Sequence, residues 1–92
     1  MEYKIVYTKK FEKDIKNLKK QNKDLTELFD VINCIAKGKI LDKKYKDHKL
    51  VGNFNDYREC HVENDFLLVY KIEKDILILI LYRAGTHSEI FG

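Results

Sequence analysis

Apolar positions in the first part of the chain follow a strand pattern and then a helical one. Residues 2–7 (EYKIVY) are rich in β-branched and aromatic side chains, which predicts a short strand, and Thr8 suits the N-cap of a following helix. Over residues 9–37, apolar residues recur at helical spacing with a break at Gln21-Asn22. We therefore expect a two-helix hairpin. Gly38 is expected to end it, because glycine readily takes the left-handed conformation after a helix.

The second half of the chain has the pattern of strands. Runs of apolar and β-branched residues over 57–62, 66–72 and 76–83 are separated by the turn-prone pairs Asn64-Asp65 and Lys74-Asp75. Three consecutive strands joined by tight turns predict an antiparallel β-meander. In the first strand, alternation places Tyr57, Glu59 and His61 on one face and Arg58, Cys60 and Val62 on the other.

The run ILILILY at 76–82 is apolar on both faces, which predicts a central strand with the helices on one side. The tail at 84–92 or a partner chain is expected to cover part of the other side. The predicted fold class is α+β, with an N-terminal strand, a two-helix hairpin and an antiparallel meander in a single domain over residues 1–92.

Composition narrows the functional classes. The chain of 92 residues is 45% hydrophobic and 36% charged and has no proline, as expected of a globular domain. No apolar run approaches the roughly 20 residues of a membrane span, so we expect no membrane partner and a cytoplasmic location. Cys34 and Cys60 lack CxxC spacing and are expected to be free thiols. Without HExxH, HxH, paired CxxC or a phosphate-binding glycine loop, we expect neither a metal nor a cofactor.

Positive charge is concentrated in the first half. Residues 1–50 hold 14 lysines against 8 acidic residues, whereas residues 51–92 hold 4 basic and 7 acidic residues. The segment 37–49 alone contains six lysines around Tyr45. Such a segment can neutralise backbone phosphates of RNA, and we take Lys43, Lys44 and Lys46 as candidate substrate-binding residues. The alternative is a solvated loop without a ligand.

The candidate chemistry comes from histidines near the strand ends. His48, His61 and His87 fit no helical core stripe, and Arg83 ends an otherwise apolar strand. RNA cleavage by the 2′-hydroxyl needs a base, an acid and positive charge on the phosphate. Imidazoles serve either proton-transfer role near neutral pH, and a guanidinium binds phosphate through two parallel hydrogen bonds. These residues therefore predict a ribonuclease.

Three further residues are candidates for supporting roles. Asp65 in the turn is placed to orient a histidine, although Asp is also a favoured turn residue. Phe66 and Phe91 offer rings on which an unpaired base can stack, although Phe66 is more simply explained as a core residue. For Arg83, an ion pair with Asp65 or Glu63 is the structural alternative to phosphate binding.

Motifs in the second half resemble a known family. The series YKDHKLVGNFNDYRECHVENDFLLVYK followed by LYRAGTHSEIFG is similar to the YafQ branch of the RelE superfamily, the toxins of bacterial type II toxin–antitoxin modules. The order of strand, helices and meander also matches that family, so the resemblance spans nearly the whole chain. It implies an mRNA endoribonuclease that acts on the ribosome with bound mRNA, needs no metal and is held inactive by a cognate antitoxin protein.

The resemblance also implies roles for particular residues. The functional histidine of the family's D-H-x-L motif falls on His48, and that of the R-x-x-H-V motif falls on His61. The active-site Asp falls on Asp65, the phosphate-contacting Arg on Arg83, and the C-terminal His and Phe on His87 and Phe91. Where the family often has Trp, this chain has Phe66, which keeps an aromatic ring without the indole N–H.

Other functions remain open at this stage. The main alternative is a module of the same fold that binds RNA, the ribosome or an antitoxin without cleavage, against which the intact set of candidate residues argues. A second alternative is a nuclease that cuts free RNA. A purely structural partner protein is the least favoured, because nothing structural requires an Arg and three His near the strand ends. The apolar run at 76–82 and the basic surface together predict that an antitoxin helix or strand lies over this region.

Overall fold

The chain folds around one mixed β-sheet. The computed structural model describes residues 2–92, in which five strands lie in the order β1-β5-β4-β3-β2. The edge strand β1 runs parallel to β5, whereas the other neighbours are antiparallel. The elements are β1 (Lys4–Tyr7), α1 (Lys9–Lys20), α2 (Thr26–Ala36), the 3₁₀ turn η1 (Lys43–Tyr45), β2 (His48–Lys49), the 3₁₀ turn η2 (Gly52–Phe54), β3 (Arg58–Glu63), β4 (Phe66–Glu73), β5 (Ile78–Gly85) and α3 (His87–Phe91).

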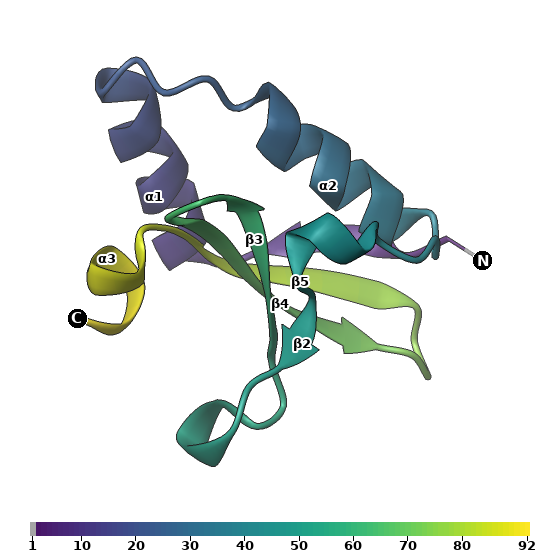
Figure 1. The fold of residues 1–92 in the computed structure, drawn as a ribbon. Helices are drawn as coiled ribbons and strands as arrows, with labels where there is room; N and C mark the ends of the chain where they lie inside the picture. The colour runs from purple at the N-terminus through teal and green to yellow at the C-terminus, as the bar shows by residue number, and fades with distance from the viewer. Residues whose placement is uncertain (1) are drawn as a thin grey trace.

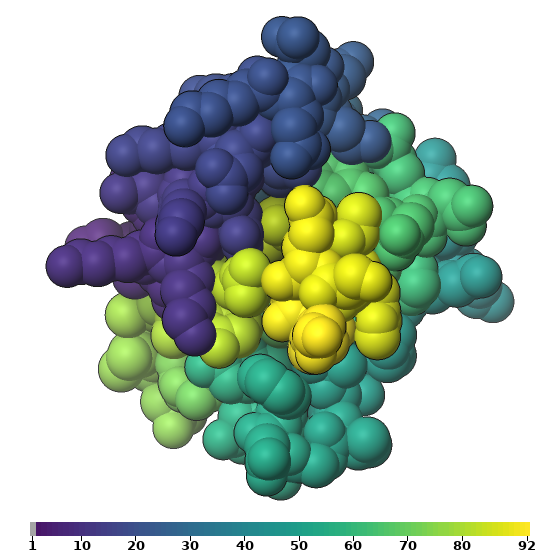
Figure 2. Space-filling model, turned by 90° about the vertical axis from the view of Figure 1, so that its left-hand side faces the viewer, coloured from purple at the N-terminus to yellow at the C-terminus, as the bar shows by residue number. Residues whose placement is uncertain are grey.

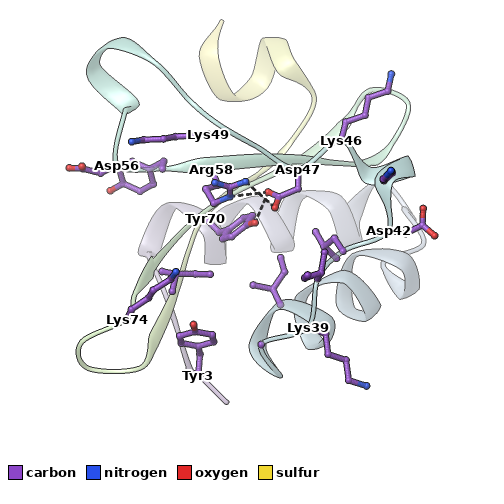
Figure 3. Close-up of a pocket in the computed structure, with 17 residues that line it drawn as sticks. Tyr3, Lys39, Asp42, Lys46, Asp47, Lys49, Asp56, Arg58, Tyr70 and Lys74 are labelled. Atoms are coloured by element: carbon purple, nitrogen blue, oxygen red, sulfur yellow. Dashed lines mark hydrogen bonds and ion pairs between the residues drawn. The ribbon is translucent and has the colours of Figure 1, made fainter. Parts of the chain in front are cut away.

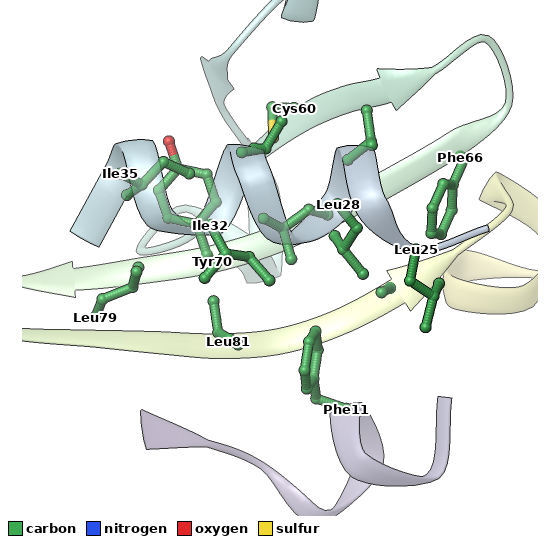
Figure 4. Packing of buried hydrophobic residues seen from close by; sticks show 14 of the residues in the cluster. Phe11, Leu25, Leu28, Ile32, Ile35, Cys60, Phe66, Tyr70, Leu79 and Leu81 are labelled. Atoms are coloured by element: carbon green, nitrogen blue, oxygen red, sulfur yellow. The ribbon is translucent and has the colours of Figure 1, made fainter. Parts of the chain in front are cut away.

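Helices α1 and α2 lie on the same face of the sheet and open into a V rather than a closely paired hairpin (Figure 1). The main hydrophobic core lies between them and the strands, where Leu28, Leu68 and Leu79 are completely buried. Figure 4 shows Phe11 from α1 and Leu28 from α2 approaching the row of side chains on β4 and β5. None of the helices in residues 2–92 is long and apolar enough to cross a bilayer.

Local sequence signals explain where the helices begin and end. Thr8 caps α1, because its hydroxyl oxygen accepts a hydrogen bond from the Phe11 amide (3.0 Å) and donates one to the Tyr82 carbonyl (2.8 Å). The turn between the helices contains Asn22 at φ 58°, a conformation that Asn tolerates better than most residues. Gly38 has φ 74° after α2, as predicted, and its amide donates to the Ile35 carbonyl (2.9 Å).

The predicted elements are confirmed with small shifts at their ends. The meander of β3, β4 and β5 is antiparallel, and β5 is a central strand, as its two-sided apolar pattern predicts. Neither the 3₁₀ turns η1 and η2 nor the elements β2 and α3 were predicted. The two-residue strand β2 is too short to have a periodic signal, and α3 lies in the segment expected to be an irregular tail.

The sheet face opposite α1 and α2 is also partly covered. Leu67 and Val69 alternate with the core residues Leu68 and Tyr70, yet they are 1% and 0% exposed. The loop that carries η2 extends to this side of the sheet, away from the two long helices (Figure 1). Phe54 of this loop contacts Phe91 of α3, with ring centroids 5.5 Å apart. The C-terminal tail therefore contributes to this second layer, as expected.

Candidate active site

Strand register brings the candidate residues into two neighbouring rows across the sheet. In the first row, His48 pairs with Glu59, Glu59 with Val69, and Val69 with Arg83. In the next row, His61 pairs with Leu67 and Leu67 with Gly85, two residues before His87. Neighbouring strands are about 4.8 Å apart, so the backbones of His61 and Gly85 are separated by roughly 10 Å. A compact site at this end of the sheet follows from the register alone.

Two of the predicted histidines share a carboxylate. Glu59 on β3 is only 6% exposed, and its Oε1 atom lies 3.4 Å from His48 Nε2 and 3.7 Å from His61 Nε2. The two imidazole centroids are 6.2 Å apart. Glu59 is therefore positioned to stabilise positive charge on either ring. Within residues 2–92, no three side chains of His, Cys, Asp or Glu are grouped so that they could hold one metal ion.

The His48 ring is held in a defined protonation pattern by the backbone. Its Nδ1 atom lies 2.7 Å from the Lys46 carbonyl oxygen, which can only accept a hydrogen bond. Nδ1 therefore carries a hydrogen, and Nε2 is the atom that gains or loses a proton beside Glu59. Lys46 itself has φ 49°. A left-handed turn in residues 37–49, which we call the lysine-rich loop, therefore creates this contact.

A partly buried polar cluster anchors the loop that carries His48. Asp47 accepts hydrogen bonds from the Tyr70 hydroxyl (2.6 Å) and from the Nε and Nη2 atoms of Arg58 (both 3.3 Å), as the dashed lines in Figure 3 show. Burial and the contact with Asp47 raise the pKa of Tyr70, so its hydroxyl remains a donor at neutral pH. The hydrogen bond to Asp47 also raises the pKa of Arg58. The cluster fixes the residue next to His48 against β3 and β4.

Asp65 supports His87 through the backbone rather than through the imidazole. One Asp65 carboxylate oxygen accepts a hydrogen bond from the His87 amide (3.2 Å) at the start of α3. A capping box begins the same helix: the Glu89 carboxylate accepts a hydrogen bond from the Thr86 amide (2.8 Å), and the Thr86 hydroxyl oxygen accepts one from the Glu89 amide (3.2 Å). The His87 side chain is exposed to solvent and lies 5.1 Å from the Phe91 ring. Asp65 thus orients the helix that presents this histidine.

Arg83 is paired, but with a different partner from either one considered in the sequence. Its Nε and Nη2 atoms donate to the two oxygens of Asp14 on α1 at 2.7 and 3.0 Å, and Nη2 also reaches the Glu89 carbonyl (3.3 Å). The expected alternatives were Asp65 and Glu63, so that prediction was wrong. The edge of the guanidinium formed by Nε and Nη2 is already occupied by a carboxylate. A phosphate must therefore use the remaining Nη1 edge or displace Asp14.

The predicted substrate-binding residues divide into three groups. The lysines Lys43, Lys44 and Lys46 are exposed, and Lys43 and Lys46 line a cavity of about 660 Å³ between the lysine-rich loop and the sheet, with Lys46 on the rim drawn in Figure 3. Phe91 is half-buried beside His87. Phe66 is 4% exposed within the hydrophobic core, so the prediction that a base stacks on it was wrong.

Three residues of this site were missed in the sequence. Glu59 had a usable signal, because strand alternation already placed it on the face of His61, and a carboxylate between aromatic and imidazole side chains merits attention. Asp47 lies in the D-H-x-L motif and had only that weak signal. Asp14 had none, because 69 positions separate it from Arg83.

The sequence and the fold of this chain are similar to those of bacterial toxins. Residues 3–92 match the family model described as the bacterial toxin of the type II toxin–antitoxin system, YafQ. The chain is similar to the mRNA interferase toxin YafQ of Escherichia coli K12, with 36% identity over 89 residues, 96% of this chain and 95% of that protein. Its fold is similar to a metal-bound toxin from Helicobacter pylori (TM-score 0.90, 47% identity, 99% and 100% of the two chains). It is equally similar to YafQ in the E. coli DinJ–YafQ toxin–antitoxin complex (TM-score 0.90, 34% identity, 100% of each chain).

Proposed function

The chain belongs to the YafQ family of toxins from bacterial type II toxin–antitoxin systems, and from this membership we propose that it is an mRNA interferase, an endoribonuclease that inhibits translation. The observation that carries the proposal is the pair of rows across the sheet that gather His48, Glu59, His61 and Arg83 near His87. These residues provide three imidazoles and one guanidinium, carried by neighbouring rows of the sheet and by α3.

In the proposed reaction, the 2′-hydroxyl of the RNA attacks the adjacent phosphorus. The base removes the hydroxyl proton as the new O–P bond forms, and the acid protonates the 5′-oxygen as the P–O5′ bond breaks. The products are a 2′,3′-cyclic phosphate and a 5′-hydroxyl. We assign one proton transfer to His87 and the other to the group formed by His48, Glu59 and His61, each worth about 10²- to 10⁴-fold in rate. Arg83 stabilises the charge that develops on the phosphate.

Glu59 has a specific role in this scheme. It is nearly buried and lies beside both imidazoles, so it stabilises the imidazolium that forms when either ring accepts a proton. Asp65 acts on His87 through the backbone of α3 and is therefore a positioning residue. The exposed lysines Lys43, Lys44 and Lys46 bind the RNA backbone.

The ribosome with bound mRNA is the proposed substrate complex, and the cytoplasm is the proposed location. An exposed site with few groups gains most from a substrate that is already positioned, because positioning lowers the barrier without further contacts from the enzyme. The test is to add the purified chain to ribosomes programmed with a defined mRNA and to map new 5′ ends. Ribosome-free mRNA and the His87→Ala variant serve as controls.

Each outcome of this test separates the candidate functions. Cuts that occur only with ribosomes and disappear in His87→Ala support the ribosome-dependent interferase. Cuts in free mRNA support a general ribonuclease, and the absence of cuts from folded wild-type protein supports a module that binds without cleavage. Treating the protein with a chelator, and removing the chelator before the protein is added to ribosomes in their Mg²⁺ buffer, tests whether a metal held by the protein takes part, a question raised by the metal-bound H. pylori toxin. The proposed proton transfers need none and predict an unchanged rate.

We also propose that a cognate antitoxin docks beside β1. Leu79 and Leu81 of β5 are buried under the helices, so the centre of the run over 76–82 is not an exposed surface, although Ile76 and Leu77 at its start are 65% and 41% exposed. A groove of about 510 Å³ instead lies between β1, α1 and α2, where Ile5, Tyr7 and Phe29 are exposed. The groove also includes Lys16 and Lys19, which suits an amphipathic segment with acidic residues.

The docking proposal is tested by two charge substitutions. Phe29→Glu places a carboxylate in the groove and is expected to weaken antitoxin binding at least tenfold by isothermal titration calorimetry. Val51→Glu is the matched control, because Val51 is an equally apolar and more exposed residue outside the groove. Equal losses in both variants, or none in either, would reject the groove as the docking site.

A further inference from the structure

Four aromatic rings from three distant segments form one continuous cluster next to the candidate active site. Tyr57 and Tyr82 have ring centroids 4.8 Å apart, and Phe54 lies 6.4 Å from each of them. Phe91 joins the cluster through an edge contact with Phe54 at 5.5 Å, and its other neighbour is His87 at 5.1 Å. We call these four residues, Phe54, Tyr57, Tyr82 and Phe91, the aromatic surface. In Figure 2 the teal segment that contains residues 52–54 lies directly beside the yellow α3.

The aromatic surface differs from the hydrophobic core in its exposure. All four rings are only half-buried, whereas the core aromatics Phe66 and Tyr70 are 4% and 2% exposed. The rings lie outside the core cluster formed by the helices and the strands. They therefore cover the second face of the sheet while part of each ring remains in contact with solvent.

The two tyrosine hydroxyls of the surface donate no hydrogen bond to another residue in the described part of the chain. Tyr45 donates to Glu27 and Tyr70 donates to Asp47, but in the described part of the chain neither Tyr57 nor Tyr82 has a hydrogen bond from its hydroxyl. If the rings only sealed the sheet, the hydroxyls would have no function, and leucine would serve as well. A tyrosine with a free hydroxyl is suited to stacking against a polar, flat ligand while its edge stays hydrated.

Positive charge flanks the same surface. The Lys10 ammonium lies 5.8 Å from the Tyr82 centroid, and the Lys71 ammonium lies 5.8 Å from the Tyr57 centroid. Lys71 also pairs with Glu73 at 3.0 Å. Both lysines have long flexible stems, and a contact with an exposed ring is weak enough to be exchanged for a phosphate. Aromatic rings between lysines match the bases and the backbone of a single-stranded nucleic acid.

We propose that the aromatic surface is a binding site for unpaired RNA bases, which positions the scissile phosphate beside His87. The inference rests on the proposed function and extends it by assigning Phe54, Tyr57 and Tyr82 to substrate binding together with Phe91. The occupant is single-stranded RNA rather than a protein, because the rings lead directly to the imidazole of His87. Any base can stack on an aromatic ring, so this surface increases the affinity for RNA and fixes the position of the strand, but it adds little preference for particular bases.

Binding to an uncleavable oligonucleotide tests the proposal independently of catalysis. A short single-stranded 2′-O-methyl RNA and an abasic oligonucleotide with the same number of phosphates are titrated against the protein at low salt by fluorescence anisotropy. The wild type is expected to bind the oligonucleotide with bases at least tenfold more tightly, because stacking changes affinity by roughly 5- to 150-fold per base. Equal affinity for both oligonucleotides would overturn the proposal.

Substitutions then locate the effect. Tyr57→Leu and Tyr82→Leu each preserve cover over the sheet but remove the stacking ring, and they are expected to reduce the preference for bases at least fivefold. Tyr7→Leu is the matched control, because Tyr7 is an exposed tyrosine on β1 outside the surface, and it is expected to keep the full preference. Thermal melts confirm that each variant is folded, and Phe54→Leu replaces any variant that is not.

The outcomes separate this inference from the proposed function. If ribosome-dependent cleavage fails but the preference for bases depends on the tyrosines, the surface is a nucleic-acid site in a protein that does not cleave. If cleavage succeeds and the tyrosine variants keep both the preference for bases and the wild-type KM, the aromatic surface is rejected while the interferase remains. Loss of antitoxin binding without loss of oligonucleotide binding would assign the surface to a protein partner and also reject the inference.

Discussion

Replacing Asp14 is expected to destabilise the fold strongly, although this residue has no predicted role in chemistry. Its carboxylate accepts hydrogen bonds from two nitrogens of Arg83 and from the Ala84 amide (3.0 Å). Its side chain is 12% exposed and that of Arg83 is 19% exposed, so water replaces these contacts only in part. The change Asp14→Ala therefore leaves the Ala84 amide without this partner and the mostly buried Arg83 guanidinium with only the Glu89 carbonyl.

The magnitude follows from the contacts that are lost. Removing one member of a buried ion pair costs about 3–5 kcal/mol, and the residual exposure here reduces this to roughly 2–4 kcal/mol. For a domain of this size each kcal/mol corresponds to about 4–8 °C in the melting temperature, so we expect a decrease of roughly 8–32 °C. Because the whole domain is stable by only about 5–15 kcal/mol, Asp14→Ala is expected to be folded but marginal.

Thermal and urea unfolding, followed by circular dichroism, measure this effect. Asp30→Ala is the control, because Asp30 is an exposed helical Asp without a hydrogen bond and its loss is expected to change stability by less than about 0.5 kcal/mol. The double variant Asp14→Leu with Arg83→Met removes both charges and is expected to recover part of the loss. A melting temperature for Asp14→Ala within 3 °C of the Asp30→Ala value would refute the reasoning.

Three further results are expected. Burial raises the pKa of Cys60 to about 12, so in a Cys34→Ser variant at pH 8 iodoacetamide should react with Cys60 only after denaturation, and rapid alkylation of the folded protein would contradict this. The hydrogen bond to Glu27 raises the pKa of Tyr45 from 10.0 to about 12, so the folded state holds the phenolic proton more tightly than the unfolded state does. The stability that this hydrogen bond provides is complete below pH 10 and is lost as the pH rises towards 12. Urea midpoints should therefore fall less steeply between pH 10 and 12 in Tyr45→Phe than in the wild type, and parallel slopes would exclude the contact. Glu59→Gln keeps the side-chain shape beside the imidazoles but removes the charge, and it is expected to lower kcat for ribosomal cleavage at least tenfold with little change in KM.

Features with a local cause could be predicted from the sequence. The helices, the stop at Gly38 and the three meander strands arise from periodicity and turn residues, and all are confirmed. The helix α3 also had a local signal, because Thr86 and Glu89 have the spacing of a capping box, but a five-residue helix at the end of a chain is easily interpreted as an irregular tail.

Features that join distant segments could not be predicted from residue patterns. The parallel pairing of β1 with β5 and the ion pair between Asp14 and Arg83 each join segments about 70 positions apart, and no periodic pattern encodes the partner. The placement of Phe66 shows the same limit, because an aromatic residue at the start of a strand has the same local pattern whether it faces the core or an RNA base. Its burial is decided by the helices packed against it.

The parallel pairing of β1 with β5 determines when the sheet can be completed during synthesis of the chain. The first strand of the chain has a single partner, and that partner is the last strand to be made. A nascent chain that has released only β1, α1 and α2 has no strand against which to fold β1, and contacts of such long range form slowly. The sheet that supports His61 and His87 can therefore be completed only after β5 has been made, so the candidate active site forms at the end of synthesis rather than during it.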